Sequence, residues 1–352
     1  MGKNIGYPAP EQEYKVLVNC ATFNHSKYIE EALNGFAIQQ TNFPFVCYIL
    51  DDASTDGEQD VIKAWMEREC DMEKAETTDI PSSIVIIVPH KSNPTCNFAF
   101  YLLKKNLFKE REERLRHISP WREKCEYEAL CEGDDYWTDP LKLKKQVDFL
   151  DLEPEYTAIA TNARNISFDG NYISLFSRKK SRNLVNMGDL GIERQFHSAS
   201  ILLRLNNLFL SPYSEVKDPW DTFVWCCLLS QGPIRYDDSI TCVYRKGVGV
   251  THTTSRLKWI EINEDWSNIL YEKFGEKYLS YTAAYLSLTR DILDMLCLYK
   301  DIAPTDKKIL KAKYNKYSNL EINIINISYV FRLCLQKSIL KVKKLKKILC
   351  NR

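Results

Sequence analysis

Three acidic residues, Glu132, Asp134 and Asp135, lie within four positions of one another in the stretch CEGDDYWTD at residues 131–139. Carboxylates this close repel one another unless a cation lies among them. Carboxylate oxygens suit Mg²⁺ and Mn²⁺, which fill their remaining positions with water and phosphate oxygens. The stretch therefore predicts a site for a metal ion and a diphosphate. The alternative is a solvated acidic turn, with Asp139 as N-cap of the helix expected after it.

A second acidic pair, Asp51 and Asp52, occurs in the stretch YILDDASTDG. An aspartate at the end of a strand can accept a hydrogen bond from a ribose hydroxyl or from a base. A carboxylate facing N3 of a pyrimidine favours uracil, whose N3 is a donor, over cytosine, whose N3 is an acceptor. The alternative is an Asx turn followed by a helix cap at Ser54 or Thr55. That alternative explains the hydroxyl residues and does not suffice to explain Asp51 and Asp52.

Alternating strand and helix patterns in the first half of the chain position these acids. Short apolar runs predict strands at residues 15–20, 45–50, 83–88 and 127–131. Helical patterns cover residues 26–40, with Ser26 as N-cap, then a segment ending near 70, and residues 98–108 and 140–152. Continuous apolar strands that alternate with helices predict a mostly parallel sheet flanked by helices on both faces.

Polar side chains follow each of the four predicted strands. Thr22 and Asn24 follow the first strand, the aspartate pair follows the second, His90 the third, and the acidic turn the fourth. Ligands of open parallel sheets bind beyond the carboxyl ends of the strands. We therefore expect these four groups to meet at one edge of the sheet.

The second half of the chain has a less regular pattern. Residues 155–190 suggest strands and loops, and helical patterns continue after about residue 258. Other expected elements are a strand in HSASILLRL, a helix over residues 218–231 with Asp218 as N-cap, and strands at residues 234–236 and 240–245.

The composition fits an ordinary globular protein of 352 residues, with 45% hydrophobic and 27% charged residues. A net charge of +1 gives no reason to expect a nucleic-acid partner. The 12 cysteines have no zinc-type spacing, and we interpret them as reduced, mostly buried thiols of a cytoplasmic protein. The N-terminal stretch lacks the apolar core of a signal peptide, and no run is long enough to predict a transmembrane helix.

Five stretches, taken in order, resemble the family 2 glycosyltransferases of the GT-A fold, in particular bacterial enzymes that build surface polysaccharides. The likeness covers about residues 14–250. It implies an inverting, metal-dependent transfer of sugar from a nucleotide-sugar, with UDP expected, to a hydroxyl of a growing glycan or lipid-linked acceptor. The stretches are CATFNHSKYIEEAL, YILDDASTDG, CEGDDYW, HSASILLR and WDTFVWCCLLSQGPIRYDDSITCVYR.

The resemblance also implies roles for individual residues. Asp221 matches the acid that serves as general base, although Asp218 competes with it; we prefer Asp221 because Asp218 is expected to cap the helix. The nucleotide pocket would contain Thr22, Asn24, Asp51 and Asp52, with Asp52 on the uracil or its ribose. The divalent cation, Mn²⁺ or Mg²⁺, would be held mainly by Asp134, with Glu132 and Asp135 near the metal, the ribose and the diphosphate.

Further candidates carry an alternative structural role. His90 could face the base, and His25 could simply cap a helix. His197 could contact phosphate or be a hydrogen-bonded residue at a strand end, and Arg245 could pair with a phosphate or with a structural acid. His252 could reach the diphosphate or belong only to a loop. Trp137 and Trp220 lie beside acids and could stack on sugars, whereas Trp225 is expected in the core.

The expected organisation is an N-terminal extension at 1–13, a catalytic domain at 14–255 with halves 14–135 and 136–255, and a helical C-terminal extension at 256–352. Residues 322–352 contain eight Lys or Arg and no acid, with apolar residues at helical spacing. Such a basic amphipathic helix can lie on an anionic membrane surface, which would make the protein peripheral to the inner face of a membrane. The alternative is packing on the catalytic domain or on a second subunit.

Two other functions compete with sugar transfer. A nucleotidyltransferase also combines a parallel sheet with acidic metal ligands, but it would need a phosphate loop rich in glycine and lysine where this chain has Ala-Thr-Phe-Asn. A non-catalytic nucleotide- or carbohydrate-binding module would bind its ligand without needing Asp221. The presence of both the metal motif and the downstream acid favours catalysis.

Overall fold

The computed structural model describes residues 12–108, 110–177, 183–185, 195–206 and 221–248, together with residues 265, 268–269, 272–273 and 308–312. The chain separates into two compact units, Met1–Val185 with Arg194–Gly249, and Asn186–Glu193 with Val250–Arg352. Most of the described residues, including the whole sheet, belong to the first unit. The predicted domain boundary at residue 255 and the basic tail lie outside the described residues.

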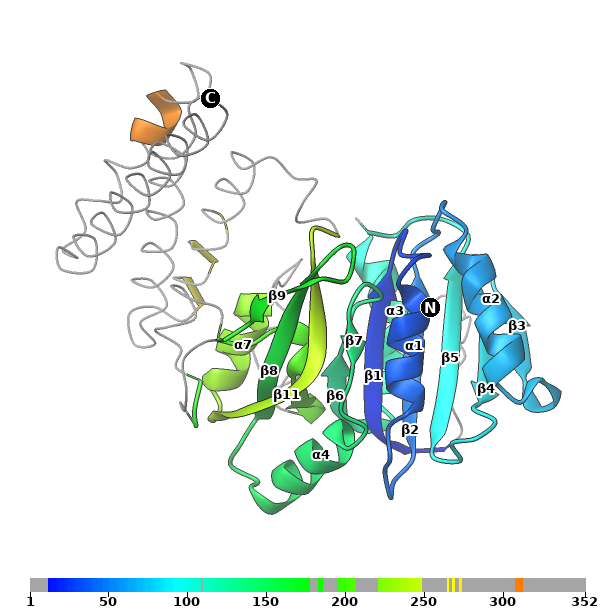
Figure 1. Ribbon diagram of the computed structural model, residues 1–352, viewed down its shortest axis with the longest axis horizontal. Helices are drawn as coiled ribbons and strands as arrows, with labels where there is room; N and C mark the ends of the chain where they lie inside the picture. The colour runs from blue at the N-terminus through cyan, green and yellow to red at the C-terminus, as the bar shows by residue number, and fades with distance from the viewer. Residues whose placement is uncertain are drawn as a thin grey trace, which may run out of the picture. The chain divides into compact units, whose positions relative to one another are not determined.

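A single mixed sheet forms the centre of the first unit (Figure 1). Its strand order is β3-β4-β5-β2-β1-β6-β10-β8-β11-β7, and β9 pairs with β8. The strands are β1 Tyr14–Thr22, β2 Phe45–Asp51, β3 Glu76–Asp79, β4 Ser83–Pro89, β5 Cys96–Leu103, β6 Cys125–Leu130, β7 Tyr136–Trp137, β8 Ala158–Ser167, β9 Tyr172–Leu175, β10 Leu202–Arg204 and β11 Ile234–Lys246.

The central strands β5, β2, β1 and β6 are parallel to one another. Strand β10 is antiparallel to both β6 and β8, and β11 is parallel to β8. The carboxyl ends of β1, β2, β6 and β11 therefore point to the same edge of the sheet. Because β10 runs the other way, the residues that precede it also reach this edge.

Helices cover both faces of the sheet. The described helices are α1 Ile29–Ala37, α2 Glu58–Glu69, α3 Arg111–Arg122, α4 Lys142–Leu152 and α7 Asp221–Leu229, with short 3₁₀ turns at Met72–Lys74 and Ser198–Ser200. Side chains of α1, α2 and α4 share one apolar cluster, and those of α3 belong to a second cluster. The order of strands and helices confirms the predicted α/β class.

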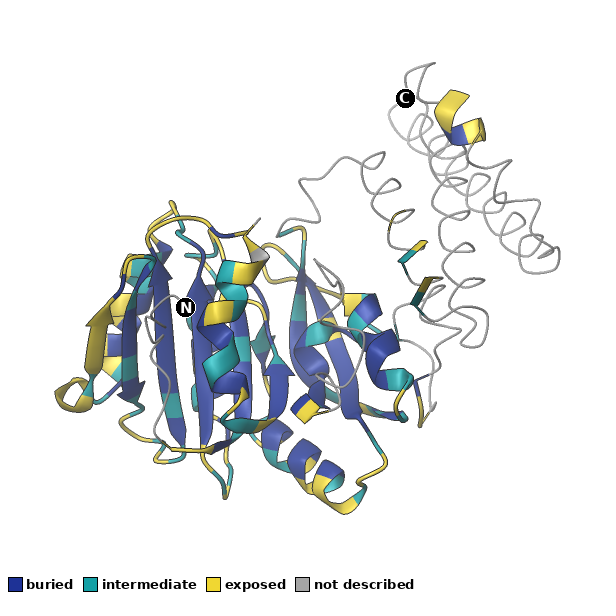
Figure 2. Ribbon diagram, turned by 180° about the vertical axis from the view of Figure 1, so that it is seen from behind, coloured by how far each residue is buried: buried dark blue, intermediate teal, exposed yellow. Residues whose placement is uncertain are grey.

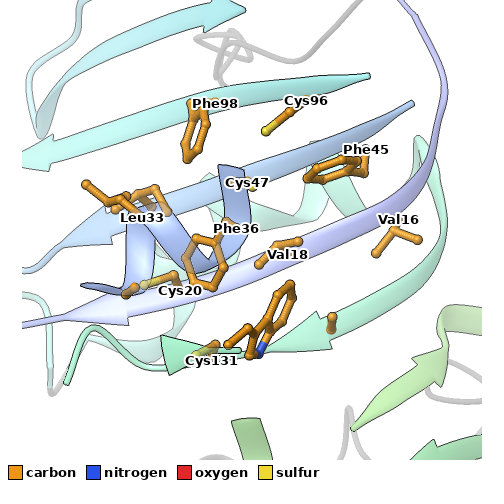
Figure 3. Close-up of a cluster of buried hydrophobic side chains, with 14 of the residues drawn as sticks. Val16, Val18, Cys20, Leu33, Phe36, Phe45, Cys47, Cys96, Phe98 and Cys131 are labelled. Carbon is orange, nitrogen blue, oxygen red and sulfur yellow. The ribbon is translucent and has the colours of Figure 1, made fainter. Parts of the chain in front are cut away.

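The two clusters follow from the alternation of side chains along buried strands. Val16, Val18 and Cys20 of β1 face Leu33 and Phe36 of α1 in the first cluster (Figure 3). Leu17 and the alternate residues of β2 face α3 in the second cluster. Figure 2 shows the central strands buried and the outer faces of the helices exposed. A sheet buried on both faces explains why the strands read as continuous apolar runs.

The helix predicted over residues 98–108 is wrong, because this stretch contains most of strand β5. The run FAFYLL is buried along its whole length between β2 and β4. Periodicity does not distinguish a short, fully buried strand from a buried helix, since both are apolar all round. The stretch is a strand because its backbone completes the ladders on both sides.

Strand β4 is antiparallel to β5, which overturns the expected position of His90. Pro89 pairs with Asn97, and Cys96 pairs with Phe45 at the start of β2. His90 therefore lies at the edge of the sheet opposite the acidic turn. Its backbone amide donates to the carbonyl of Cys96 at 3.0 Å, and its Nδ1 accepts from the amides of Ser92 and Asn93. The prediction that His90 faces the nucleotide is wrong.

Two element boundaries also differ from the sequence predictions. Helix α1 begins at Ile29, and Tyr28 occupies the N-cap position without a side-chain cap. The backbone amide of Ser26 donates to Asp56 in the loop after β2, so Ser26 does not cap the helix. The two strands predicted in the 234–245 region form one strand, β11, with register shifts against β8.

The described cysteines are free and nearly all are buried, in agreement with the sequence interpretation. Only Cys125 among them is partly exposed. Burial raises the pKa of several thiols, including that of Cys131, so these side chains behave as apolar groups in the core.

Within the described ranges, no helix combines the length and apolar character needed to span a bilayer.

Candidate active site at the carboxyl edge of the sheet

The acidic turn, residues 132–135, connects β6 to β7 and packs closely against the end of β1. The amide of Gly133 donates to the carbonyl of Ala21 at 3.2 Å. A Cβ atom at Gly133 would lie 2.6 Å from Cβ of Thr22, which is closer than two carbon atoms can approach. Glycine is therefore required at this position for the turn to lie against β1.

Asp134 has the features of a cation ligand. The residue is 5% exposed, and its buried Oδ1 has no hydrogen-bond partner among the described residues. Its Oδ2 lies 3.8 Å from Nε2 of His25. A buried carboxylate oxygen without a partner is costly unless a cation or a bound ligand satisfies it. The side chain therefore fits a divalent cation, although the described residues contain no group of three or more His, Cys, Asp or Glu side chains arranged to hold one. Glu132 lies exposed in the same turn.

Asp135 instead connects the turn to neighbouring strands. Its Oδ1 accepts from the backbone amide of Arg245 at 2.9 Å, and its Oδ2 lies 3.4 Å from Nδ1 of His197. Burial, followed by the charge of Asp134, raises the pKa of the Asp135 carboxyl well above its usual range. Asp135 thus has structural partners, and its place among the metal ligands stays a prediction.

Arg245 fixes the acidic turn from the end of β11. The residue is 3% exposed, and Nε donates to the carbonyl of Asp134 at 3.2 Å. The guanidinium also forms an ion pair with Glu31 of α1 and lies over the ring of Tyr28, 4.3 Å from its centroid. Of the two alternatives raised by the sequence, the structural acid is the partner that Arg245 has.

The second acidic pair lies at the end of β2, where Asp51 is fully buried. Oδ1 of Asp51 accepts from the amide of Ser54 at 3.1 Å and from Nε2 of Gln59 at 2.6 Å. The bond to Ser54 spans three residues, one more than in an Asx turn, and the N-cap of α2 is Gly57 rather than Ser54 or Thr55. The buried Oδ2 of the same carboxylate has no hydrogen-bond partner within the described part of the chain.

Asp52 connects β2 to the loop that follows β5. Its carboxylate accepts from the amide of Leu107, and its carbonyl accepts from Nδ2 of Asn106 at 3.0 Å. Burial raises the pKa of this carboxyl. Asp52 thus has a structural partner, and its contact with a base or ribose stays a prediction.

Glu58 at the start of α2 is a site residue that sequence reasoning missed. Its buried carboxylate accepts from the Thr22 hydroxyl, from the amide of His25 at 2.8 Å and from the Ser54 hydroxyl at 2.8 Å. Burial raises its pKa, and the hydrogen bonds oppose that rise. In the sequence this residue looks like an ordinary solvated acid in the first turn of a helix, so no signal identified it.

Asn24 joins the loop after β1 to the loop after β2. It adopts a left-handed backbone conformation with φ 59°, and its Oδ1 accepts from the amide of Thr55 at 2.7 Å. The backbone amide of Asn24 donates to the Ser54 hydroxyl at 2.9 Å. The side chains of Thr22 and Asn24 therefore shape the loops at this edge, and their contact with a nucleotide stays a prediction.

Trp137 is a core residue, so its predicted contact with a sugar is wrong. Its side chain is 1% exposed, and Nε1 donates to the carbonyl of Ala199 at 2.8 Å. The ring packs edge-on against Phe36, and the ammonium of Lys142 lies 4.3 Å from its centroid. Trp225 is buried against Phe196, as expected.

His197 reaches the site edge because it precedes the antiparallel strand β10. It is 6% exposed, its Nδ1 accepts from the amide of Ala199 at 3.2 Å, and its ring stacks on Tyr244 with centroids 4.1 Å apart. This environment matches the hydrogen-bonded histidine considered from the sequence. His197 therefore lies next to the acidic turn, beside Asp135.

The downstream acid Asp221 is the first residue of α7 and is exposed. Asp218, Trp220 and His252 lie outside the described residues, so their predicted roles are not tested by the structure. The described part of the site thus unites the ends of β1, β2, β6 and β11 and the start of β10.

Comparisons with known proteins agree with this architecture. No family model matches the sequence. Uncharacterized proteins from Mycobacterium bovis and from two strains of Mycobacterium tuberculosis are 38% identical to the chain over 243 residues, which is 68% of this chain and 62% of each relative. The chain thus spans less than two thirds of the length of these curated relatives.

Two solved structures of S. aureus TarS, residues 1–349, share the fold. The complex with UDP-GlcNAc has a TM-score of 0.55 at 16% identity and covers 86% of this chain and 80% of that chain. The complex with UDP has a TM-score of 0.52 at 15% identity and covers 87% of this chain and 81% of that chain. The chain therefore shares the fold of TarS. The fold class expected from the sequence is thereby confirmed.

Proposed function

We propose that the protein is a metal-dependent glycosyltransferase that transfers a sugar from a nucleotide-sugar, with UDP as the expected nucleotide, to a hydroxyl acceptor. The observation that carries the proposal is the buried Asp134 carboxylate, with one oxygen lacking a partner among the described residues, at the carboxyl edge of the parallel strands. In this class of sheet that edge is where ligands bind. The same fold in TarS has been solved with UDP-GlcNAc and with UDP.

The proposal gives the two acidic clusters different tasks. Asp134 and Glu132 would hold the divalent cation, which when bound would neutralise charge on the diphosphate leaving group. Asp51 and Asp52, at the end of β2, would lie on the nucleoside side of the same edge. Oδ2 of Asp51, which has no hydrogen-bond partner among the described residues, is suited to accept a hydrogen bond from a ribose hydroxyl or from N3 of uracil.

Asp221 is the proposed general base. It would take the proton from the acceptor hydroxyl while that oxygen attacks the anomeric carbon from the side opposite the diphosphate, which inverts the configuration. The carboxylate is exposed at the first position of α7, so an acceptor can approach it. On the family resemblance, we further propose that the acceptor is a growing surface glycan or a lipid-linked sugar.

A donor screen tests the proposal. The full chain is incubated with Mn²⁺ or Mg²⁺ and a panel of UDP-, CDP- and GDP-sugars, and release of the nucleotide is measured with and without added glycan acceptors. We expect release from one nucleotide class only, dependent on the cation and faster with the right acceptor. Binding of nucleotide without release or transfer would instead support a non-catalytic binding module. Release of pyrophosphate in a parallel incubation with nucleoside triphosphates would indicate a nucleotidyltransferase.

A further inference from the structure

We propose that His25 is a ligand of the same divalent cation, bound through Nε2 beside Asp134. The inference rests on the proposed function, because it names a further residue of the same metal site. His25 lies in the loop after β1, and its side chain is 11% exposed. Sequence reasoning does not place it in the site, because a histidine four residues before a helix is also explained as a helix cap.

The distance between the two side chains fits a shared cation. Nε2 of His25 and Oδ2 of Asp134 are 3.8 Å apart, which is beyond hydrogen-bond range. Two ligands that each lie about 2.1 Å from one ion are separated by about 3.0 Å at a right angle and about 4.2 Å when they are opposite each other. The observed separation falls within that range.

The hydrogen bonds behind the imidazole prepare Nε2 for this role. Nδ1 of His25 lies 3.1 Å from the hydroxyl oxygen of Thr22. That hydroxyl donates its own proton to Glu58, so it accepts from Nδ1–H. The proton of a neutral imidazole is then on Nδ1, and the lone pair on Nε2 points toward Asp134. Metal-bound histidines commonly have this arrangement, in which the second ring nitrogen donates to an oxygen that fixes the tautomer.

The ring is also held in place by its backbone. The amide of His25 donates to the Glu58 carboxylate, so Glu58 restrains both the main chain and, through Thr22, the side chain. Glu58 itself is fully buried at the start of α2. A ligand restrained at both ends loses little conformational entropy when it binds a metal, which favours a defined coordination position.

A nitrogen ligand has a consequence for metal choice. Imidazole is a good ligand for first-row transition metals, whereas Mg²⁺ prefers oxygen ligands. His25 should therefore strengthen binding of Mn²⁺ relative to Mg²⁺. Without the imidazole, the two carboxylates should discriminate less between these ions.

Pulsed EPR of Mn²⁺ bound to the full chain, with and without UDP, tests the inference directly. We expect nitrogen modulation from a coordinated imidazole in the wild type, and a change in its frequency when the protein is labelled with ¹⁵N-histidine. The modulation should disappear in His25→Ala and in the similarly sized His25→Gln. It should remain in His90→Ala, at the opposite edge of the sheet, and in His197→Gln, which removes the histidine behind the acidic turn. Mn²⁺ affinity should fall about tenfold or more in both His25 variants, with a smaller loss for Mg²⁺.

The outcomes separate this inference from the proposed function. The wild type could bind Mn²⁺ without nitrogen modulation, and Asp134→Asn could lose that binding. This result would overturn the His25 assignment and leave the proposed metal site intact. Modulation that persists in both His25 variants would also overturn it. Absence of Mn²⁺ binding to the wild type, even with UDP, would contradict the inference and the metal-dependent function together.

Discussion

Arg245 and Asp134 are 111 positions apart in the sequence, yet Nε of Arg245 donates a 3.2 Å hydrogen bond to the carbonyl of Asp134. The neighbouring carboxylate of Asp135 accepts from the Arg245 amide. The last strand of the sheet thus holds the backbone of the acidic turn while the Asp134 side chain stays available for a ligand. The position of the proposed metal site depends on this connection.

Replacement of Arg245 by lysine should destabilise the protein and loosen the turn. Lysine keeps the charge but lacks the planar fork that reaches Glu31 and the Asp134 carbonyl together. We expect a loss of about 1–3 kcal/mol in the free energy of unfolding. This loss is smaller than that for a fully buried ion pair, because Glu31 is half exposed. Urea denaturation measures this loss. The control is Arg68→Lys, at a surface pair, where we expect no measurable change in the free energy of unfolding. Equal effects of the two variants would contradict the proposed role of Arg245.

Gly133 should not tolerate a side chain. A Cβ atom would lie 2.6 Å from Cβ of Thr22, so the turn must move away from β1. We expect Gly133→Ala to cost about 1–3 kcal/mol of stability, as overpacking does, and Gly133→Val to cost more. Thermal unfolding and UDP titration should show losses that increase with the size of the side chain. Wild-type behaviour of both variants would mean that the turn does not pack on Thr22.

Lys142 should make stability rise with pH in a defined window. It is fully buried beside Trp137 and donates to Gln146, and burial lowers its pKa to about 8 from the ordinary 10.5. Between these two values the unfolded chain binds a proton that the folded protein has released, so a rise in pH favours the folded state. The cost of burying the charge is therefore greatest below pH 8.

The comparison of wild type with Lys142→Met isolates this effect from other groups that titrate at alkaline pH. From pH 8 to 10.5 the stability of the wild type should gain on that of the variant by up to about 1.4 kcal/mol for each pH unit. Chemical unfolding at a series of pH values measures the difference. A constant difference across the window would show that Lys142 titrates normally.

The sequence predicted the main strands and the edge at which the acids meet, because buried parallel strands are continuous apolar runs that end in polar residues. It failed where the deciding contact is remote. The run FAFYLL is a strand because it lies between β2 and β4, and His90 is on the opposite edge because β4 is antiparallel. Neither fact is contained in the local pattern.

The residues that support the site were also hidden from sequence reasoning. Glu58 follows a turn at a helix start, where an acid normally faces water, and only the fold brings Thr22 and His25 to its carboxylate. Trp137 adjoins the acidic turn in sequence, but the alternation of side chains along β7 directs its ring into the core. Proximity in sequence to a charged turn therefore predicted its environment poorly.

Asp221→Asn should separate donor binding from transfer. The amide has nearly the same shape but cannot accept a proton as a base, so the transfer rate should fall by about 10²–10⁴-fold while UDP affinity stays the same. Steady-state measurement of nucleotide release with acceptor, together with UDP titration, provides both values. Asp60→Asn, at an exposed position of α2, is the control and should behave as wild type. A normal rate in Asp221→Asn would assign the base to another residue.

Metal-dependent UDP binding through Asp134 is measured by calorimetric titration of UDP into the full chain, with and without Mn²⁺, for wild type, Asp134→Asn and the control Asp60→Asn. We expect UDP to bind to wild type and to the control only when Mn²⁺ is present. Asp134→Asn should lose this binding while its far-UV circular dichroism and unfolding transition remain. UDP affinity that is unchanged in Asp134→Asn, or absent from the wild type with Mn²⁺, would contradict the proposed role of Asp134.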